Sequence, residues 1–230
     1  RFPAFRGIAT MAEWMQQHPD AMLYLSNQFL IDLVVWYHLG WTAESVRRAD
    51  ARVQQLQDKA HGFTVRDRRE LLGILLEMLR SVVPRYRRLA ESGRVELAMS
   101  PYAHPILPLL LDIRAGAETQ PEARLPLIDR YAGGRERARW HLRHGRDVFE
   151  RHFGITPAGC WPSEGALSNA TLELLATEGF RWSASGENVL RNSIGAGAGH
   201  ADLHAPGHTC QHRVYRFAEN TVDCFFRDDG

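Results

Sequence analysis

Hydrophobic positions recur at helical spacing in the first half of the chain. Residues 43–60 carry apolar side chains near this spacing among many Arg, Asp and Gln residues, which predicts a polar helix. From residue 65 to 91 the apolar positions repeat every three or four residues, which predicts a long helix with one buried face. Thr64 is a suitable N-cap for this helix. Pro84 is expected to kink or split it, and Gly93 to end it.

Beyond residue 94 the hydrophobic pattern changes to short runs typical of strands. Helical patterns separate these runs at residues 124–153, with a break near Gly133, and at 167–178, where Ser168 or Asn169 can cap the helix. The predicted strands are residues 95–100, 158–161, 180–185, 213–217 and 221–226. Strands that alternate with helices predict an α/β fold with a parallel sheet or barrel.

Polar side chains follow several of the predicted strands directly. They are residues 100–104, Glu164, residues 185–187 and residues 227–229. In folds built from parallel strands, reactive groups gather beyond the carboxyl ends of the strands. The pattern alone therefore predicts a functional site at this edge of the sheet.

Composition narrows the possible partners. Lys and Arg number 28 against 27 Asp and Glu, a net charge of +1, which argues against a dedicated binder of nucleic acid or of an anionic membrane. Three cysteines without a C-x-x-C pair indicate reduced thiols. The sequence contains no run of about 18 apolar residues, so it predicts no membrane-spanning helix. We expect a cytoplasmic protein with neither a nucleic-acid nor a membrane partner.

Glu164 is the strongest candidate for chemistry. It comes directly after a predicted strand and close to Trp161, whose indole offers a flat apolar face on which a sugar ring could stack. The alternative is that Glu164 caps the following helix, where a carboxylate favours the positive end of the helix dipole.

Asp228 and Asp229 follow an apolar strand, and Arg227 could stabilise one of these carboxylates. The alternative is an exposed Asp-Asp-Gly turn. Together with Glu164, one of the two aspartates would supply the pair of carboxyl groups that glycoside cleavage needs. One group attacks the anomeric carbon, and the other protonates the leaving oxygen.

Histidines offer two further candidate sites. His104 lies between Tyr102 and Pro105, where it could bind a sugar hydroxyl or a catalytic carboxylate, or be purely structural. His200, His204, His208 and His212 repeat every four residues, but Pro206 and Gly207 break any helix there, and no recognised metal-binding spacing is present. We expect no metal. Phosphate-binding glycine loops are absent from the sequence, and we expect no cofactor.

Four segments resemble glycoside hydrolase family 57, in matching order from about residue 30 to the last residue. Residues 100–110, SPYAHPILPLL, resemble the family's TPYYHPILPLL block. Residues 159–166, GCWPSEGA, resemble its G-x-W-P-S-E-G block. Residues 32–41 and 225–230 are similar to its DLQVWFNLAWF and FFRD-x-x-LSD segments.

The resemblance implies an incomplete (β/α)7 barrel that acts on α-glucans with retention of configuration. Glu164 is then the nucleophile, and the acid/base is an aspartate of the last segment. Asp228 matches the FRD aspartate, Asp229 matches the DDG version of the motif, and the LSD aspartate, which this sequence does not contain, is a third possibility. His104 is expected to line the pocket. The other side chains expected to bind substrate are Tyr102, Trp161, Trp182, Glu187 and Arg227.

The sequence also departs from the family pattern. The opening H-x-x-Q-P block is absent, and Gly186 stands where many members have Asp. We therefore expect residues 1–230 to be a partial catalytic barrel domain, truncated at both ends, that alone folds poorly or is inactive. Two other functions stay open. One is a metal-dependent polysaccharide deacetylase that uses the His-rich loop, and the other is a non-catalytic glucan-binding protein that uses Tyr102, Trp161 and Trp182.

Overall fold

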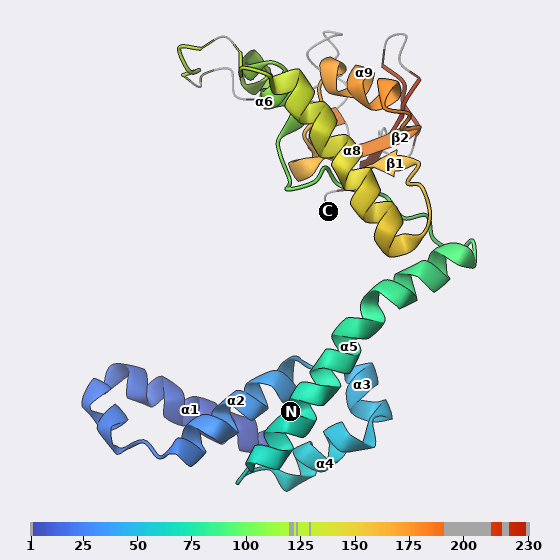
Figure 1. The fold of residues 1–230 in the computed structure, drawn as a ribbon. Coiled ribbons are helices and arrows are strands. Elements are labelled where there is room, and N and C mark those ends of the chain that lie inside the picture. Colours follow the sequence, from blue (N-terminus) through green and yellow to red (C-terminus); the bar gives the residue numbers. More distant parts are fainter. Residues whose placement is uncertain are drawn as a thin grey trace. The chain divides into compact units, whose positions relative to one another are not determined.

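The computed structural model describes residues 2–119, 122, 124–128, 130–190, 213–217 and 221–228. The chain forms two compact units, Arg1–Val82 and Val83–Gly230 (Figure 1). Within the described residues, no helix is both long enough and apolar enough to cross a membrane. Each unit is described below by itself.

The described part of the first unit contains helices and no strand. The pattern at residues 43–60 forms two helices rather than the single predicted one, because Asp50 leaves the helical conformation and its side chain accepts the N–H of Arg52 as an N-cap. The elements are α1 (Pro3–Gln17), the 3-10 helix η1 (Pro19–Tyr24), α2 (Asn27–Trp41), α3 (Glu44–Ala49), α4 (Ala51–Lys59) and the first part of α5 (Val65–Glu91).

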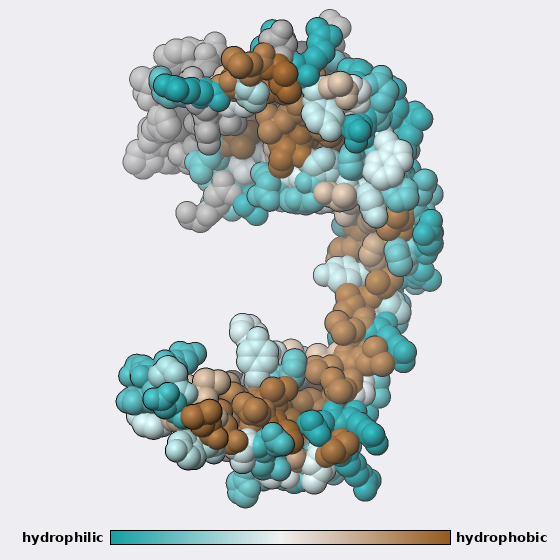
Figure 2. Space-filling view, turned by 60° about the vertical axis from the view of Figure 1, so that its left-hand side comes forward, coloured by the Kyte–Doolittle hydropathy of each residue, from teal (hydrophilic) through white to brown (hydrophobic). Residues whose placement is uncertain are grey.

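Helix α5 matches the predicted span of 65–91, and Pro84 lies inside it without splitting it. The prediction of one buried face is only partly right. Leu71 and Ile74 are buried in the core of the first unit. Other apolar side chains of the helix stay exposed, among them Leu72 and Leu79. Apolar surface runs along this helix in the space-filling view (Figure 2).

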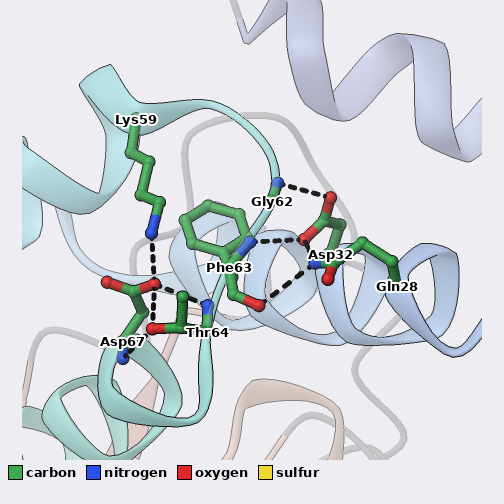
Figure 3. Close-up of polar contacts among 7 residues, drawn as sticks. All are labelled: Gln28, Asp32, Lys59, Gly62, Phe63, Thr64 and Asp67. Carbon is green, nitrogen blue, oxygen red and sulfur yellow. Dashed lines mark hydrogen bonds and ion pairs between the residues drawn. The ribbon is translucent and has the colours of Figure 1, made fainter.

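A buried carboxylate joins α2 to the loop before α5. Asp32 accepts hydrogen bonds from the backbone N–H groups of Gly62 (2.8 Å) and Phe63 (2.9 Å) and from the side-chain amide of Gln28 (2.7 Å) (Figure 3). Close by, the indole N–H of Trp36 donates to the carbonyl of Ala60 at 2.6 Å. Because both oxygens of Asp32 have partners, its burial is compensated.

Thr64 caps α5, as the sequence predicts. Its hydroxyl accepts the N–H of Asp67 at 3.3 Å, and the carboxylate of Asp67 accepts the N–H of Thr64 at 2.6 Å, which is a reciprocal capping box (Figure 3). Lys59 donates to the same carboxylate at 2.5 Å. The pKa of Asp67 is lowered to about 2. The main cause is the hydrogen bond from Lys59, and the second is the hydrogen bond from the backbone N–H of Thr64.

The second unit is an α/β structure around a parallel sheet, as the strand and helix pattern predicts. The sheet has the order β1 (Gly159–Cys160), β2 (Trp182–Gly186), β3 (Asp223–Arg227), with all pairs parallel. The helices are α6 (Leu107–Leu111), η2 (Ile113–Ala115), α7 (Gly116–Thr119), α8 (Gly134–Phe153), η3 (Ser163–Gly165) and α9 (Asn169–Thr177). Ser168 caps α9 by accepting the N–H of Thr171.

Three boundaries in the second unit differ from prediction. Helix α8 begins at Gly134, directly after the left-handed Gly133, so the part of the predicted helix at 124–128 is not helical. Of the predicted strand at 95–100, only Met99 forms a bridge, parallel to Cys160. Of the predicted strand at 213–217, only Tyr215 forms a bridge, antiparallel to Cys224.

Helices α8 and α9 lie beside the sheet (Figure 1). Their apolar side chains form one core with those of the sheet. Leu142 of α8 and Leu175 of α9 are fully buried there, together with the free thiols of Cys160 and Cys224. Burial raises the pKa of Cys160 to about 12 and that of Cys224 to about 11. These thiols are therefore protonated core residues at neutral pH.

Replacing the buried carboxylate tests the junction in the first unit. The variant Asp32→Asn places an amide N–H₂ group against one of the two backbone N–H groups from which Asp32 accepts hydrogen bonds. We expect the free energy of unfolding to fall by about 1.5–3 kcal/mol, the usual contribution of a hydrogen bond to a charged group. Chemical denaturation of the variant measures the loss. Asp58→Asn, at an exposed position, is the control, and equal stability of the two variants would contradict this role of Asp32.

The capping box predicts a pH dependence. Because the folded pKa of Asp67 is about 2, below its ordinary value of 3.8, its contribution to stability is complete above about pH 4 and is lost as pH falls toward 2. The difference in unfolding free energy between wild type and Asp67→Asn should therefore shrink from pH 5 to pH 2. A difference that stays constant across this range would show that the carboxylate charge is unimportant.

Candidate active site

Glu164 lies in a tight turn directly beyond β1. Its backbone is left-handed, with φ of 56°, and Gly165 continues in the same region with φ of 66°. The N–H of Gly165 donates to the carbonyl of Pro162, and that of Ala166 to the carbonyl of Ser163, both at 3.0 Å. The turn exposes 74% of the Glu164 side chain. The carboxylate therefore faces outward, although its backbone is strained by about 1–2 kcal/mol.

A second strained loop brings His104 to Glu164. Ala103 and His104 are also left-handed, both with φ of 57°, and the N–H of His104 donates to the carbonyl of Pro101 at 3.0 Å. Nδ1 of His104 lies 3.9 Å from Oε1 of Glu164. In the described part of the chain four non-glycine residues have positive φ, and three of them are in these two loops. Strain of this kind clusters at functional sites.

The two loops meet because the segments before them are neighbours in the sheet. The N–H of Met99 donates to the carbonyl of Gly159 at 3.2 Å, and the N–H of Trp161 donates to the carbonyl of Met99 at 2.8 Å. The pairing is parallel, so both segments leave the sheet at the same edge. The loops that carry His104 and Glu164 must therefore start side by side.

The end of β3 reaches the same edge. Arg227 pairs with Gly186 of β2. Its guanidinium lies over the indole of Trp161, 5.9 Å from the ring centre. Asp228 follows at this edge and is exposed. Asp229, the other aspartate predicted as acid/base, lies outside the described residues.

Glu187 and Tyr102 also follow strand segments at this edge. Glu187 comes directly after β2 and is half-buried. The ring of Tyr102 packs against α8, with its centre 4.4 Å from that of His144 and 5.8 Å from that of Trp140. The backbone of Tyr102 is held by His141, whose carbonyl accepts the Tyr102 N–H at 3.1 Å. The contacts of the Tyr102 ring are thus with α8.

Trp182 lies at the opposite edge of the sheet, because it is the first residue of β2. Its indole N–H donates to Glu96 at 2.6 Å, and its ring covers Gly159 so closely that a Cβ there would lie 2.0 Å from it. The structure thus gathers His104, Trp161, Glu164 and Arg227 at one edge and leaves Trp182 at the other.

One contact at this edge has no signal in the sequence. The hydroxyl of Ser185, at the end of β2, donates to the carbonyl of Gly165 in the turn of Glu164, at 2.5 Å. The sequence places Ser185 among the polar residues at a strand end, but nothing local reveals its partner on another loop.

The predicted His-rich loop, with His200, His204, His208 and His212, lies outside the described residues. Among the residues that the structure does describe, no group of three or more His, Cys, Asp or Glu could hold a metal ion.

Comparison with known families classifies the chain. The family model described as glycosyl hydrolase family 57 matches residues 10–230, nearly the whole chain. The chain belongs to this family. The segments quoted above for the resemblance, including the block with Glu164, fall within the matched region. No curated protein sequence matches the chain.

Three solved structures are similar to the chain. They are the α-amylase AmyC of Thermotoga maritima (13% identity, TM-score 0.45), a GH57-type branching enzyme of Pyrococcus horikoshii (18%, 0.45) and the GH57 branching enzyme TK1436 of Thermococcus kodakaraensis, in complex with glucose (18%, 0.47). The matches cover 86%, 86% and 87% of this chain. They span 30%, 33% and 34% of those proteins, about a third of their length.

The strain at Glu164 predicts that a glycine there stabilises the fold. Glu164→Gly relieves the left-handed strain and should raise the free energy of unfolding by about 0.5–1 kcal/mol, after the entropy that glycine adds to the unfolded chain. Glu173→Gly makes the same change at an exposed position inside α9 and should lower it by about 1 kcal/mol. Denaturant titration measures the free energy of unfolding of both variants. If both variants changed it in the same direction, the backbone at Glu164 would not be strained.

Proposed function

We propose that this family 57 chain is part of a retaining glycoside hydrolase or transglycosylase that acts on α-glucans. Glu164 is the nucleophile, and an aspartate of the last segment, Asp228 or Asp229, is the acid/base. The main support is the geometry at one edge of the sheet, where an exposed Glu164 carboxylate lies 3.9 Å from His104 and the end of β3 reaches Trp161.

The reaction would proceed in two displacements at the anomeric carbon. In the first, a carboxylate oxygen of Glu164 bonds to this carbon, the bond to the leaving oxygen breaks, and the acid/base aspartate gives that oxygen its proton. In the second, water or a sugar hydroxyl attacks the same carbon, its proton passes to the aspartate, and the bond to Glu164 breaks. Two inversions give net retention. This geometry needs the two carboxyl groups about 5–5.5 Å apart.

Neighbouring side chains would prepare this chemistry. His104 can bind a sugar hydroxyl beside the reacting carbon, since its imidazole is 57% exposed and already lies next to the carboxylate. Arg227 covers one face of Trp161, so a sugar ring would stack on the other face. Arg227 also brings a positive charge to the edge of the sheet beyond which Glu164 lies.

The parallel segments fit consecutive strands of the incomplete (β/α)7 barrel that the family resemblance implies. Met99 bridges β1 in parallel, and β1, β2 and β3 follow in this order with parallel pairing. The chain spans about a third of the solved family 57 structures that it matches. Activity is therefore expected of the complete natural protein rather than of residues 1–230 alone.

The test of the nucleophile uses the complete natural protein and maltooligosaccharides. Glu164→Gln keeps the shape of the side chain but removes its charge. We expect kcat to fall by at least about a thousandfold. Glu164→Ala with added azide should form a β-glycosyl azide, because azide enters from the face that the carboxylate has left. Full activity of Glu164→Gln, at unchanged folding, would contradict the proposal, and binding without turnover in the wild type would favour a glucan-binding protein.

The acid/base is assigned with α-glucosyl fluoride as the substrate, because fluoride leaves without being protonated and the glycosyl-enzyme therefore still forms when the acid is absent. Asp228→Ala and Asp229→Ala are compared with azide present, and the variant that has lost the acid/base should form an α-glycosyl azide. If neither variant forms this product, the acid/base is another residue.

A further inference from the structure

The left-handed turn at Glu164 needs support from outside itself. Its two internal hydrogen bonds run from Gly165 to Pro162 and from Ala166 to Ser163. Both donors come after Glu164, and neither bond involves the backbone of Glu164 itself. A non-glycine residue stays in this region only when the surrounding structure holds it there.

Ser185 supplies such a hold from the neighbouring strand. It is completely buried near the end of β2, and its hydroxyl donates to the carbonyl of Gly165 at 2.5 Å. A Cβ on Gly165 would lie 3.4 Å from this hydroxyl oxygen and 3.7 Å from the Cα of Ser185. The residue after Glu164 is therefore both hydrogen-bonded to β2 and packed against it.

A second serine of β2 forms the same kind of bond without touching the turn. Ser183 is also completely buried, and its hydroxyl donates to the carbonyl of Cys160 at 2.9 Å. Because Ser183 and Ser185 are two positions apart on one strand, their side chains share a face of the sheet. Ser183 thus joins β2 to the body of β1, whereas Ser185 joins β2 to the turn that follows β1.

We propose that Ser185 is a positioning residue for Glu164, a role that rests on the proposed function of Glu164 as the nucleophile. Its hydroxyl holds the carbonyl of Gly165, and this hold keeps Glu164 left-handed with its carboxylate beside His104. Without the donor, the turn relaxes and the carboxylate moves away from the reacting carbon. Catalysis is sensitive to such displacements, since a misplacement of 1 Å can cost about a hundredfold in rate.

Ser185→Ala tests this role in the complete natural protein, with maltooligosaccharides as substrates. We expect kcat to fall by about tenfold to a hundredfold while KM changes less than twofold, because the groups that bind sugar are untouched. Ser185→Thr keeps a hydroxyl and should recover most of the lost kcat. Ser185→Cys keeps the size but offers only a weak donor, so it should behave like Ser185→Ala.

Ser183→Ala is the matched control. It removes an equally buried hydroxyl of the same strand, so its thermal midpoint should fall about as much as that of Ser185→Ala, whereas its kcat should stay near the wild-type value. If Ser185→Ala keeps wild-type kcat, or if both alanine variants lose kcat equally, the positioning role is wrong. Should Ser185→Ala fail to fold, Ser185→Cys decides in the same way.

Failure of the proposed function would look different. If Glu164→Gln retains full activity, Glu164 is not the nucleophile, whatever Ser185 does. If Glu164→Gln is inactive and Ser185→Ala is fully active, the nucleophile stands and only the positioning role is lost.

Discussion

The parallel pairing of Met99 with β1 is the interaction on which the candidate site depends. Two backbone hydrogen bonds, from Met99 to Gly159 and from Trp161 to Met99, place two segments side by side that are far apart in the chain. Because they run parallel, the loops that carry His104 and Glu164 start at one edge. The ends of β2 and β3 reach the same edge through the same kind of pairing. The candidate site is thus located by backbone geometry before any side chain contributes.

Buried polar groups hold irregular segments in both units. In the first unit, the carboxylate of Asp32 binds two backbone N–H groups of the loop before α5. In the second, the hydroxyl of Ser185 binds a carbonyl of the Glu164 turn. Apolar packing is non-directional, so it can bury a loop but cannot select one backbone conformation. A hydrogen bond to a loop group can, since leaving that group unpaired in the interior carries a cost.

The sequence predicts what local signals encode. The Thr64 cap, the span of α5, the Ser168 cap and three parallel strands are confirmed, because capping residues and apolar periodicity act over a few residues. The apolar pattern does not predict the break at Asp50, although Asp is a strong N-cap. The contact of Ser185 with Gly165 and the packing of Tyr102 on α8 could not be predicted, because they join segments distant in sequence. The position of Trp182 follows from the strand pattern, because the first residue of a strand lies at the edge of the sheet opposite the strand's carboxyl end.

Trapping the covalent intermediate tests whether Glu164 is the nucleophile. The complete natural protein would be incubated with 5-fluoro-α-glucosyl fluoride, a reagent that forms the glycosyl-enzyme and slows its breakdown. It would then be digested and its peptides mapped by mass spectrometry. We predict a fluoroglucosyl adduct on the peptide that contains Glu164, with fragmentation placing it on that side chain. An adduct on any other residue, or an active enzyme that forms none, would contradict the account.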